Sequence, residues 1–541
     1  MPPSKRRQVD AAGADSVATA DTIERGSIGA SSNVSKGRAV AEREGQTITP
    51  LPLEVVSLIV ENLGPVYKVR RSLPCHIYSK SGPRRQRELW KSEDLDLPNI
   101  EQGFRELLQA LALVSPVWCR AAQAKLFHTI RIDGRESCQF WSRKFKHSPH
   151  LGKYVRFLHL SDPNDDCMGT PYLRTSPAKI LVSTLTRLQS LSMHRIKQWG
   201  PVEQRLIKSF RSVTTLVVGR IWGMKGCRDI PDLVYAMPNV ERLRLAVDGR
   251  DDNDLFSIYE AGAILGKRIP EDGIPPRQLR ELQLYRAHLS MEYFSWLAGP
   301  SIDLSKLVNL FLAWREFPVS VKKDEFDFSS HDEFLRLTGG YTTTLKLLIP
   351  SPSNQAELGM SHVITVSNPQ DFLTGHLISS RILNGFTALR TISICVKETD
   401  NFLPFLISTA DCLLKTLAAP HSDLHRIKLT AGLYVGDRDQ LRGSLAPEGC
   451  WQTLDELLSG DAFPVLSVVD LVVHAMGGLG RERVEQHGSM CFLVLNPNQE
   501  QLRGAIQACL PRTVSKDLLN LEIHDCDPRR GFRTTADALL A

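Results

Sequence analysis

Few residues of the chain have the type and spacing that chemistry would require. The acidic run DGRDDND (248–254) gathers carboxylates, but it lacks the required glycine and the terminal glutamate of an EF-hand calcium loop. The glycines of GGLG (477–480) do not have the spacing of a dinucleotide-binding loop. No glycine-rich stretch precedes a lysine and a serine or threonine, as a phosphate-binding loop requires. We therefore expect an exposed acidic loop, a turn and no cofactor.

The cysteines and histidines also lack a spacing that would bind metal or activate a nucleophile. Eleven cysteines are spread along the chain, and none forms the CxxC pair of a zinc site. Neither HExxH nor GxSxG occurs. His159, His194 and His524 lie at the ends of predicted strands, where we expect surface or binding roles rather than metal ligation. The sequence thus predicts no catalytic residue, no metal site and no enzyme activity.

Composition indicates a folded protein without a membrane or nucleic-acid role. Hydrophobic residues make up 42% of the chain and charged residues 23%. A net charge of +6 over 541 residues is mild and gives no sign of the basic face that nucleic acid requires. No apolar run approaches the roughly 20 residues of a membrane span, and the first residues contain no apolar leader. The odd number of cysteines favours reduced thiols and a cytoplasmic or nuclear location.

Ordered structure is expected to begin near residue 47. Residues 1–46 contain few large apolar residues, which predicts a disordered tail. Apolar residues then repeat at helical spacing from Leu53 to Leu63, and Gly64 ends the pattern. A second helical pattern runs to Val114. There we expect Ser115 to cap a new helix that begins with proline.

These two helical segments resemble an F-box, a small three-helix domain, in the style of fungal F-box proteins. LPLEVVSLIVENL (51–63) has the opening Leu-Pro-x-Glu of that family. LLQALALVSPVWCRAAQAKLFHTIRI (107–132) has its closing Val-Ser-x-x-Trp helix and the Leu-Phe that follows. The family keeps the two halves close together, whereas here residues 64–106 separate them and are expected to form a surface loop. The F-box-like domain would therefore span residues 47–132.

Within the family, this domain docks on a Skp-type adaptor and through it on a cullin. The resemblance implies that the adaptor-facing residues are Leu51, Pro52, Leu53, Val55, Ile59, Leu63, Leu111, Val114 and Trp118. They supply more apolar surface than so small a module can bury in itself. The alternative, that they pack only in the module's own core, stays open for each position.

After residue 132 one six-residue pattern recurs: apolar, two residues, apolar, one residue, apolar. Its copies begin at residues 155, 188, 213, 240, 279, 307, 342, 389, 424, 466 and 518. The pattern resembles the leucine-rich repeat, in which each copy forms a strand and a return segment. The fold class is therefore α/β. Residues 133–541 should form an irregular solenoid, with helical returns at 201–212, 409–421 and 450–464.

The fifth position of each copy should carry the binding surface. Positions four and six of a strand point into the core, so position five points to the opposite face, which we expect to be solvent-facing. Asp470 and Glu522 make the far end of that face acidic, and its middle is mostly basic. The predicted substrate-binding residues are Arg244, Gln283, Phe311, Lys346 and Lys428. Phe311 suits an interface anchor, and the charges suggest an acidic or phosphorylated segment; the alternative is a solvated face with charges scattered by chance.

The order of parts resembles the substrate-receptor subunits of cullin–RING ubiquitin ligases. Such a chain would carry no chemistry itself, and its repeat surface would select a protein substrate. The alternative is a repeat scaffold whose degenerate F-box binds partners without recruiting a ligase.

Overall fold

The fold is known from a computed structural model. It describes residues 51–62, 102–162, 172–194, 196, 198–219, 221, 226–246, 276–285, 291–313, 328–349, 376–377, 379–396, 403–417, 423–435, 448–477, 479–480, 493–494 and 499–526. The predicted tail, the acidic run 248–254 and most of the predicted loop 64–106 lie outside these ranges. None of the described helices has the length and apolar character needed to cross a membrane.

Three helices form a small module with a core of its own. They are α1 (Leu53–Asn62), α3 (Gln102–Leu111) and α4 (Pro116–Leu126). The predicted cap is present, because the Ser115 hydroxyl accepts a hydrogen bond from the Trp118 amide at 3.5 Å and proline begins α4. The buried core consists of Val56, Val60, Leu108, Ala121 and Ala122. Residues 102–106, predicted to end the loop, instead form the first half of α3.

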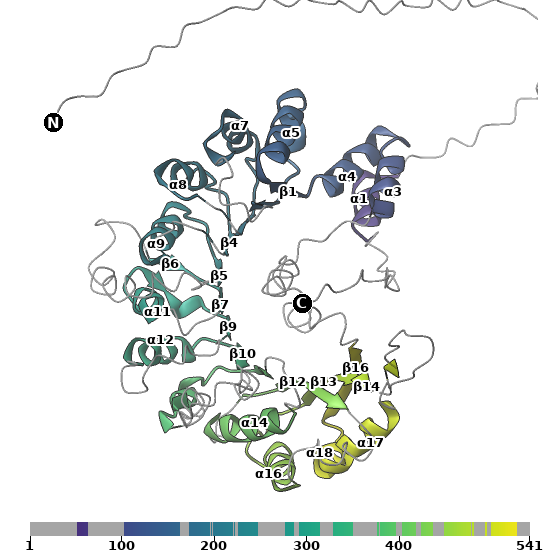
Figure 1. Cartoon of the computed structure of the whole chain (residues 1–541), viewed down its shortest axis with the longest axis vertical. Coiled ribbons are helices and arrows are strands. Elements are labelled where there is room, and N and C mark those ends of the chain that lie inside the picture. The colour runs from purple at the N-terminus through teal and green to yellow at the C-terminus, as the bar shows by residue number, and fades with distance from the viewer. Residues whose placement is uncertain are drawn as a thin grey trace, which may run out of the picture. The chain divides into compact units, whose positions relative to one another are not determined.

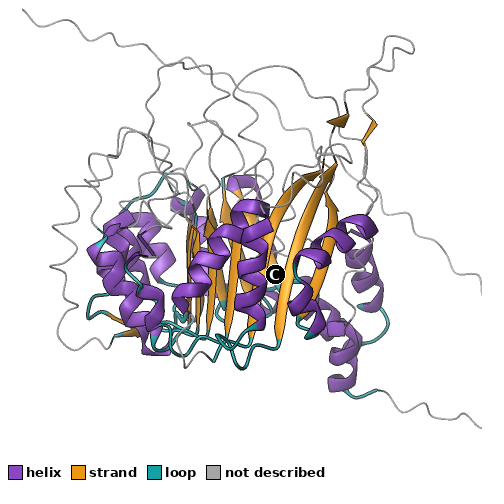
Figure 2. Cartoon of the chain, turned by 90° about the horizontal axis from the view of Figure 1, so that it is seen from below, coloured by secondary structure: helices purple, strands orange, loops and turns teal. Residues whose placement is uncertain are grey.

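A twelve-stranded parallel sheet follows, and its strands lie side by side in chain order. Figure 1 shows this succession, and Figure 2 shows helices packed along the strands. The strands are β1 (Thr129–Asp133), β2 (Phe157–Ser161), β3 (Ser190–His194), β4 (Thr215–Val218), β5 (Arg242–Ala246), β7 (Glu281–Tyr285), β9 (Asn309–Ala313), β10 (Thr344–Ile349), β11 (Thr391–Val396), β12 (Arg426–Val435), β13 (Val468–Gly477) and β16 (Leu519–Cys526). Two further pairs are β6 (Arg277–Gln278) with β8 (Ile302–Asp303), and β14 (Leu479–Gly480) with β15 (Leu493–Val494).

Helical segments connect the strands and lie along the outer side of the sheet in Figure 1. The α-helices are α5 (Gly134–His147), α6 (Pro149–Gly152), α7 (Ser176–Thr184), α8 (Pro201–Lys208), α9 (Gly226–Ala236), α11 (Met291–Leu297), α12 (Ser329–Gly339), α14 (Leu403–Leu417), α16 (Glu448–Ser459), α17 (Gln499–Cys509) and α18 (Pro511–Ser515). The 3-10 helices are η2 (Tyr172–Arg174), η4 (Leu304–Lys306) and η7 (Ile382–Gly385). The predicted helical returns correspond to α8, α14 and α16. Their apolar sides join the strand residues in one continuous core, in which Trp451 is 1% exposed.

One backbone arrangement recurs where each strand meets the next. The carbonyl of His128 accepts hydrogen bonds from the Arg156 and Phe157 amides, at 2.8 and 3.0 Å. The Arg156 carbonyl then accepts from the amides of residues 189 and 190, and the same sharing continues along the sheet as far as β13. Each such carbonyl belongs to the second position of the six-residue pattern. The pattern therefore fixes the register as well as the core.

All eleven predicted strands are present, and the register adds two corrections. Another strand, β1, precedes them and pairs with β2. The last strand pairs two residues out of step with the sequence pattern, because Asp470 lies opposite Asn520 and Val472 opposite Glu522. Leu519, Leu521 and Ile523 alternate, so a shift of two residues keeps the same side chains on the same face. The predicted turn at GGLG instead contains the end of β13 and the short strand β14.

The buried Asp455 should be important for the stability of the C-terminal helices. Its side chain lies in α16 and accepts hydrogen bonds from the Arg512 amide (3.0 Å), the Thr513 amide (2.8 Å) and the Thr513 hydroxyl (2.6 Å) at the start of α18. Asp455→Ala should lower the free energy of unfolding by about 2–3 kcal/mol, since it leaves buried donors without an acceptor. Urea denaturation measures this change. The exposed Asp461→Ala should change it by less than about 0.5 kcal/mol, and equal effects would contradict the role given to Asp455.

Candidate functional site

The three-helix module exposes an unusual amount of apolar side chain. On α1, Val55, Leu58 and Ile59 are 40%, 59% and 38% exposed; Leu58 lies opposite the buried Val56 and Val60, and Val55 and Ile59 lie beside that buried pair. The turn between α3 and α4 adds Leu113 at 88% and Val114 at 63%. Only a few small and medium side chains fill the core of the module. The helices therefore pack against each other through one set of apolar side chains, and a second set is left exposed to solvent, where a partner can contact it.

The predicted adaptor-facing residues divide into three groups. Leu51, Pro52, Leu53, Val55, Ile59 and Val114 are exposed. Leu111 and Trp118 are partly buried against the module's core, so they also serve its packing. Leu63 lies outside the described residues.

Three exposed apolar residues of the three-helix module are not among the predicted adaptor-facing residues. They are Leu58 and Leu113 together with Leu107, which is 43% exposed on α3. Helical spacing in α1 could have identified Leu58, because it lies on the same side of the helix as Val55 and Ile59. For Leu113 no such signal exists, since it lies in the turn after α3.

On the sheet, the fifth-position residues of the predicted strands from β2 to β13 form one row, which Arg131 of β1 and Asn520 of β16 extend to all twelve strands. Parallel register places in it, from β1 to β16, Arg131, His159, Ser192, Val217, Arg244, Gln283, Phe311, Lys346, Ser393, Lys428, Asp470 and Asn520. We call this set the fifth-position row. It includes all five predicted substrate-binding residues, on strands that follow one another with only Ser393 between them. Neighbouring strands lie about 4.8 Å apart, so these side chains are within reach of each other.

Glu281 organises the first part of that group. Its Oε1 accepts hydrogen bonds from Arg244 Nη2 at 3.1 Å and from Gln283 Nε2 at 2.7 Å. Arg242 Nε lies 3.9 Å from Glu281 Oε2. The Arg244 charge is therefore largely balanced within the sheet, and this part of the row is less positive than the sequence suggested.

Lys346 and Lys428 flank the buried Ser393 in the row. Both lysines are half-buried. Burial lowers the pKa of the Lys346 ammonium, and the charges of Lys428 and Arg244 lower it further, against the opposing effect of Glu281. The two lysines lie two strands apart, and their ammonium charges repel each other.

The expectation that this face is open to solvent is wrong for several of its members. Phe311 is 6% exposed and lies between Gln283 and Lys346 in the register, so its ring is packed in the row instead of standing out as an anchor. His159, Ser192, Val217, Ser393 and Asp470 are also buried. Side chains on adjacent parallel strands cover one another, and long neighbours shield short ones.

The acidic end of the row differs from the prediction in both of its residues. Asp470 is bound by the side chains of Arg426 and Asn520, the latter through Nδ2 at 2.8 Å. Burial would raise the pKa of the Asp470 carboxyl, but these hydrogen bonds and the charges of Arg426 and Lys428 hold it below its ordinary value. Glu522 lies outside the row because of the shifted register, and its Oε2 is 3.4 Å from His524 Nε2. Asp470 is thus a structural carboxylate.

A stacked histidine pair lies beyond this end of the row. His474 and His524 are opposite each other in the register, with ring centroids 5.3 Å apart and an interplanar angle of 23°. Burial, followed by the proximity of His524 and Lys428, lowers the pKa of His474 to about 4. His474 is therefore neutral at physiological pH.

This pKa predicts a measurable loss of stability in acid. Between about pH 6.5 and about pH 4 the unfolded chain protonates residue 474 and the folded chain does not, so stability falls as the pH falls. In His474→Gln the free energy of unfolding should depend less steeply on pH in that window, by up to about one proton. Urea denaturation at several pH values measures the slope. An unchanged slope in His474→Gln would refute the assignment.

A scan against protein-family models finds no match for this chain, and a search of curated proteins also finds none. Its function must therefore be inferred from the three-helix module and the fifth-position row.

Proposed function

We propose that this chain is a substrate-receptor subunit of a cullin–RING ubiquitin ligase. The three-helix module would dock on a Skp-type adaptor, and the strand–helix array, as a leucine-rich-repeat-like solenoid, would bind the protein to be modified. The observation that carries this proposal is the apolar exposure of the module, on α1 and on the turn before α4. It adds to the sequence resemblance, which involves the same helices.

Docking is favoured over a purely internal role because only some of the large apolar residues of α1 pack in the module's core. Val56 and Val60 are buried and hold the module together, whereas Val55 and Ile59 are exposed and are not part of its core. Keeping large apolar side chains in water is unfavourable by about 25 cal/mol for each Å². A partner that covers them would gain this energy without any rearrangement of the module's core.

The substrate would bind through the fifth-position row, around Lys346 and Lys428. Their charges suit an acidic or phosphorylated peptide segment. The mechanism would be positional. By holding the substrate next to a charged conjugating enzyme, the chain would raise the effective concentration of the substrate's lysines and perform no chemistry itself. Such a protein would act in the cytoplasm or nucleus.

The adaptor contact can be tested by replacing exposed apolar residues that the fold does not need. Leu113→Asp with Val114→Asp should weaken co-purification with a Skp-type adaptor at least tenfold, because docking would have to bury two carboxylates. Binding to the purified adaptor, measured by calorimetry, gives the affinity. Val202→Asp, at a position 39% exposed on α8, is the matched control and should bind as the wild type does.

Two outcomes would decide against the ligase. If the intact chain does not bind the adaptor, and deletion of residues 66–100 ahead of α3 does not restore binding, the adaptor-docking proposal fails. The chain would then be an interaction scaffold with a degenerate F-box. Equal adaptor binding by the double variant and the Val202→Asp control would show that the docking surface lies elsewhere.

Charge removal in the row should test the substrate side independently. We expect Lys346→Gln with Lys428→Gln to reduce binding to selected acidic or phosphorylated peptides by about tenfold, with a weaker dependence on salt. The measurement is a peptide array followed by fluorescence anisotropy of the best binders. Lys179→Gln, an exposed lysine of α7, is the control. Peptide binding that is unaffected by the two substitutions would place recognition outside the row.

A further inference from the structure

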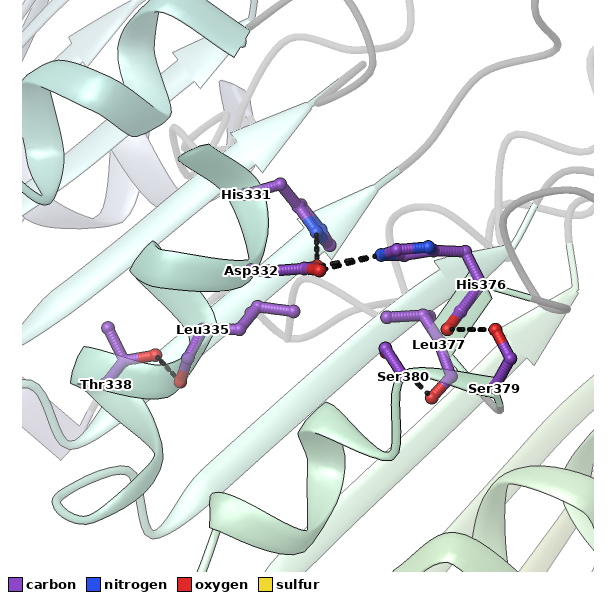
Figure 3. A network of polar contacts seen from close by, with 8 residues as sticks. All are labelled: His331, Asp332, Leu335, Thr338, His376, Leu377, Ser379 and Ser380. Atoms are coloured by element: carbon purple, nitrogen blue, oxygen red, sulfur yellow. Dashed lines mark hydrogen bonds and ion pairs between the residues drawn. The ribbon is translucent and has the colours of Figure 1, made fainter. Parts of the chain in front are cut away.

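A cluster of two imidazoles and one carboxylate lies apart from both surfaces described above. Asp332 Oδ1 is 3.3 Å from His331 Nδ1, and its Oδ1 and Oδ2 are 2.9 and 3.0 Å from His376 Nε2. Figure 3 shows the carboxylate between the two rings. One potential ligand atom from each residue lies within 4.8 Å of the other two. His331 is 2% exposed, and the side chains of Asp332 and His376 are 28% and 22% exposed.

The fold holds these three side chains from two separate elements. His331 and Asp332 lie in the first turn of α12. His376 begins a single helical turn, because its carbonyl accepts hydrogen bonds from the Ser380 amide (2.8 Å) and the Ser379 hydroxyl (3.2 Å). The buried Leu377 anchors that turn in the core.

Close packing keeps the two elements next to each other. A Cβ on Gly339, at the end of α12, would lie 2.6 Å from the carbonyl oxygen of Gly385, so only glycine permits this approach of α12 to η7, the element that directly follows the 376–380 turn. The imidazoles are also fixed by aromatic neighbours. Phe328 stacks on His376 with centroids 3.9 Å apart, and the Phe294 ring meets His331 edge-on at 5.0 Å. The ring orientations are therefore set before any ligand arrives.

We propose that His331, Asp332 and His376 bind a first-row divalent metal ion, with zinc as the best match. Zinc takes imidazole nitrogen and carboxylate oxygen at about 2.0–2.1 Å, which places neighbouring tetrahedral ligands roughly 3.3 Å apart. The distances from Asp332 to the two rings are already close to that spacing. Binding needs a small movement of His376 away from Asp332, and it brings the two imidazole nitrogens, now within 4.8 Å of each other, closer to that spacing. The partial exposure of His376 and Asp332 leaves a side for water as the fourth ligand.

Such an ion would join α12 to the 376–380 turn, two segments that are separated in the chain by β10. Two neutral imidazoles and one carboxylate give the site a charge of −1, which favours a divalent cation over an anion. The donor set excludes a preference for calcium or magnesium, which favour oxygen-only ligands. The ion would clamp the middle of the sheet, independently of the adaptor or substrate surfaces.

The test uses the full chain, stripped of metal by chelation and dialysis. Zinc should raise the melting temperature of the wild type, and Co²⁺ should give the absorption bands of a four-coordinate site. His376→Gln should weaken Co²⁺ binding about 100-fold and abolish the zinc-induced stabilisation. His150→Gln, which removes an exposed imidazole, is the matched control. Asp332→Asn, which keeps the shape of the side chain, should behave as His376→Gln does.

A second measurement needs no substitution. Bound Cu²⁺ with ascorbate and oxygen oxidises the histidines that ligate it, and mass spectrometry locates the products. Oxidation should occur at His331, despite its burial, and at His376 before the exposed His150. Oxidation that follows exposure alone, or equal Co²⁺ binding by the wild type and His376→Gln, would overturn the proposal and leave a hydrogen-bonded cluster without metal.

Discussion

The sharing of one carbonyl between two successive amides determines where the other residues of the sheet lie. From β1 to β13, each join uses the same position of the six-residue pattern, as His128 does toward Arg156 and Phe157. Corresponding residues of successive strands are therefore brought into line. The core residues fall on one face, and the fifth-position residues fall in a single row on the other. The lysines of that row are neighbours because of these backbone bonds, although Lys346 and Lys428 are far apart in the sequence.

Strands were predictable because each needs two buried residues at alternate positions, and repetition made a weak signal reliable. β1 has the same pattern, in FHTIRI (127–132), but it follows α4 almost without a break, so the sequence pattern groups it with the preceding helices and not with the repeat. The six-residue pattern could not predict how β16 aligns with β13. A side-chain period of two cannot distinguish registers that differ by two residues, and only the pairing with Val469 and Leu471 settles it.

The residue types of the candidate sites were predictable from the sequence, but the burial and the side-chain partners of those residues were not. Sequence identified which residues share the row, but burial of Phe311 and the pairing of Arg244 with Glu281 depend on neighbours one strand away. The cluster of His331, Asp332 and His376 left no signal, since an adjacent His-Asp pair and a histidine 44 residues from Asp332 match no ligand spacing. By contrast, the helical spacing of apolar residues in α1 correctly predicted that Val56 and Val60 are buried.

The two proposed contacts would depend on different forces. Covering the module buries apolar side chains such as Leu58 and Leu113, and this energy changes little with ionic strength. Binding at the row depends on ammonium groups that already repel one another, so salt would weaken it. A receptor of this kind could keep its adaptor while its hold on a substrate changes with the substrate's charge. Phosphorylation of a substrate adds negative charge at one residue. Lys346 and Lys428 would bind that charge more tightly, whereas the apolar side chains of the module would not respond to it.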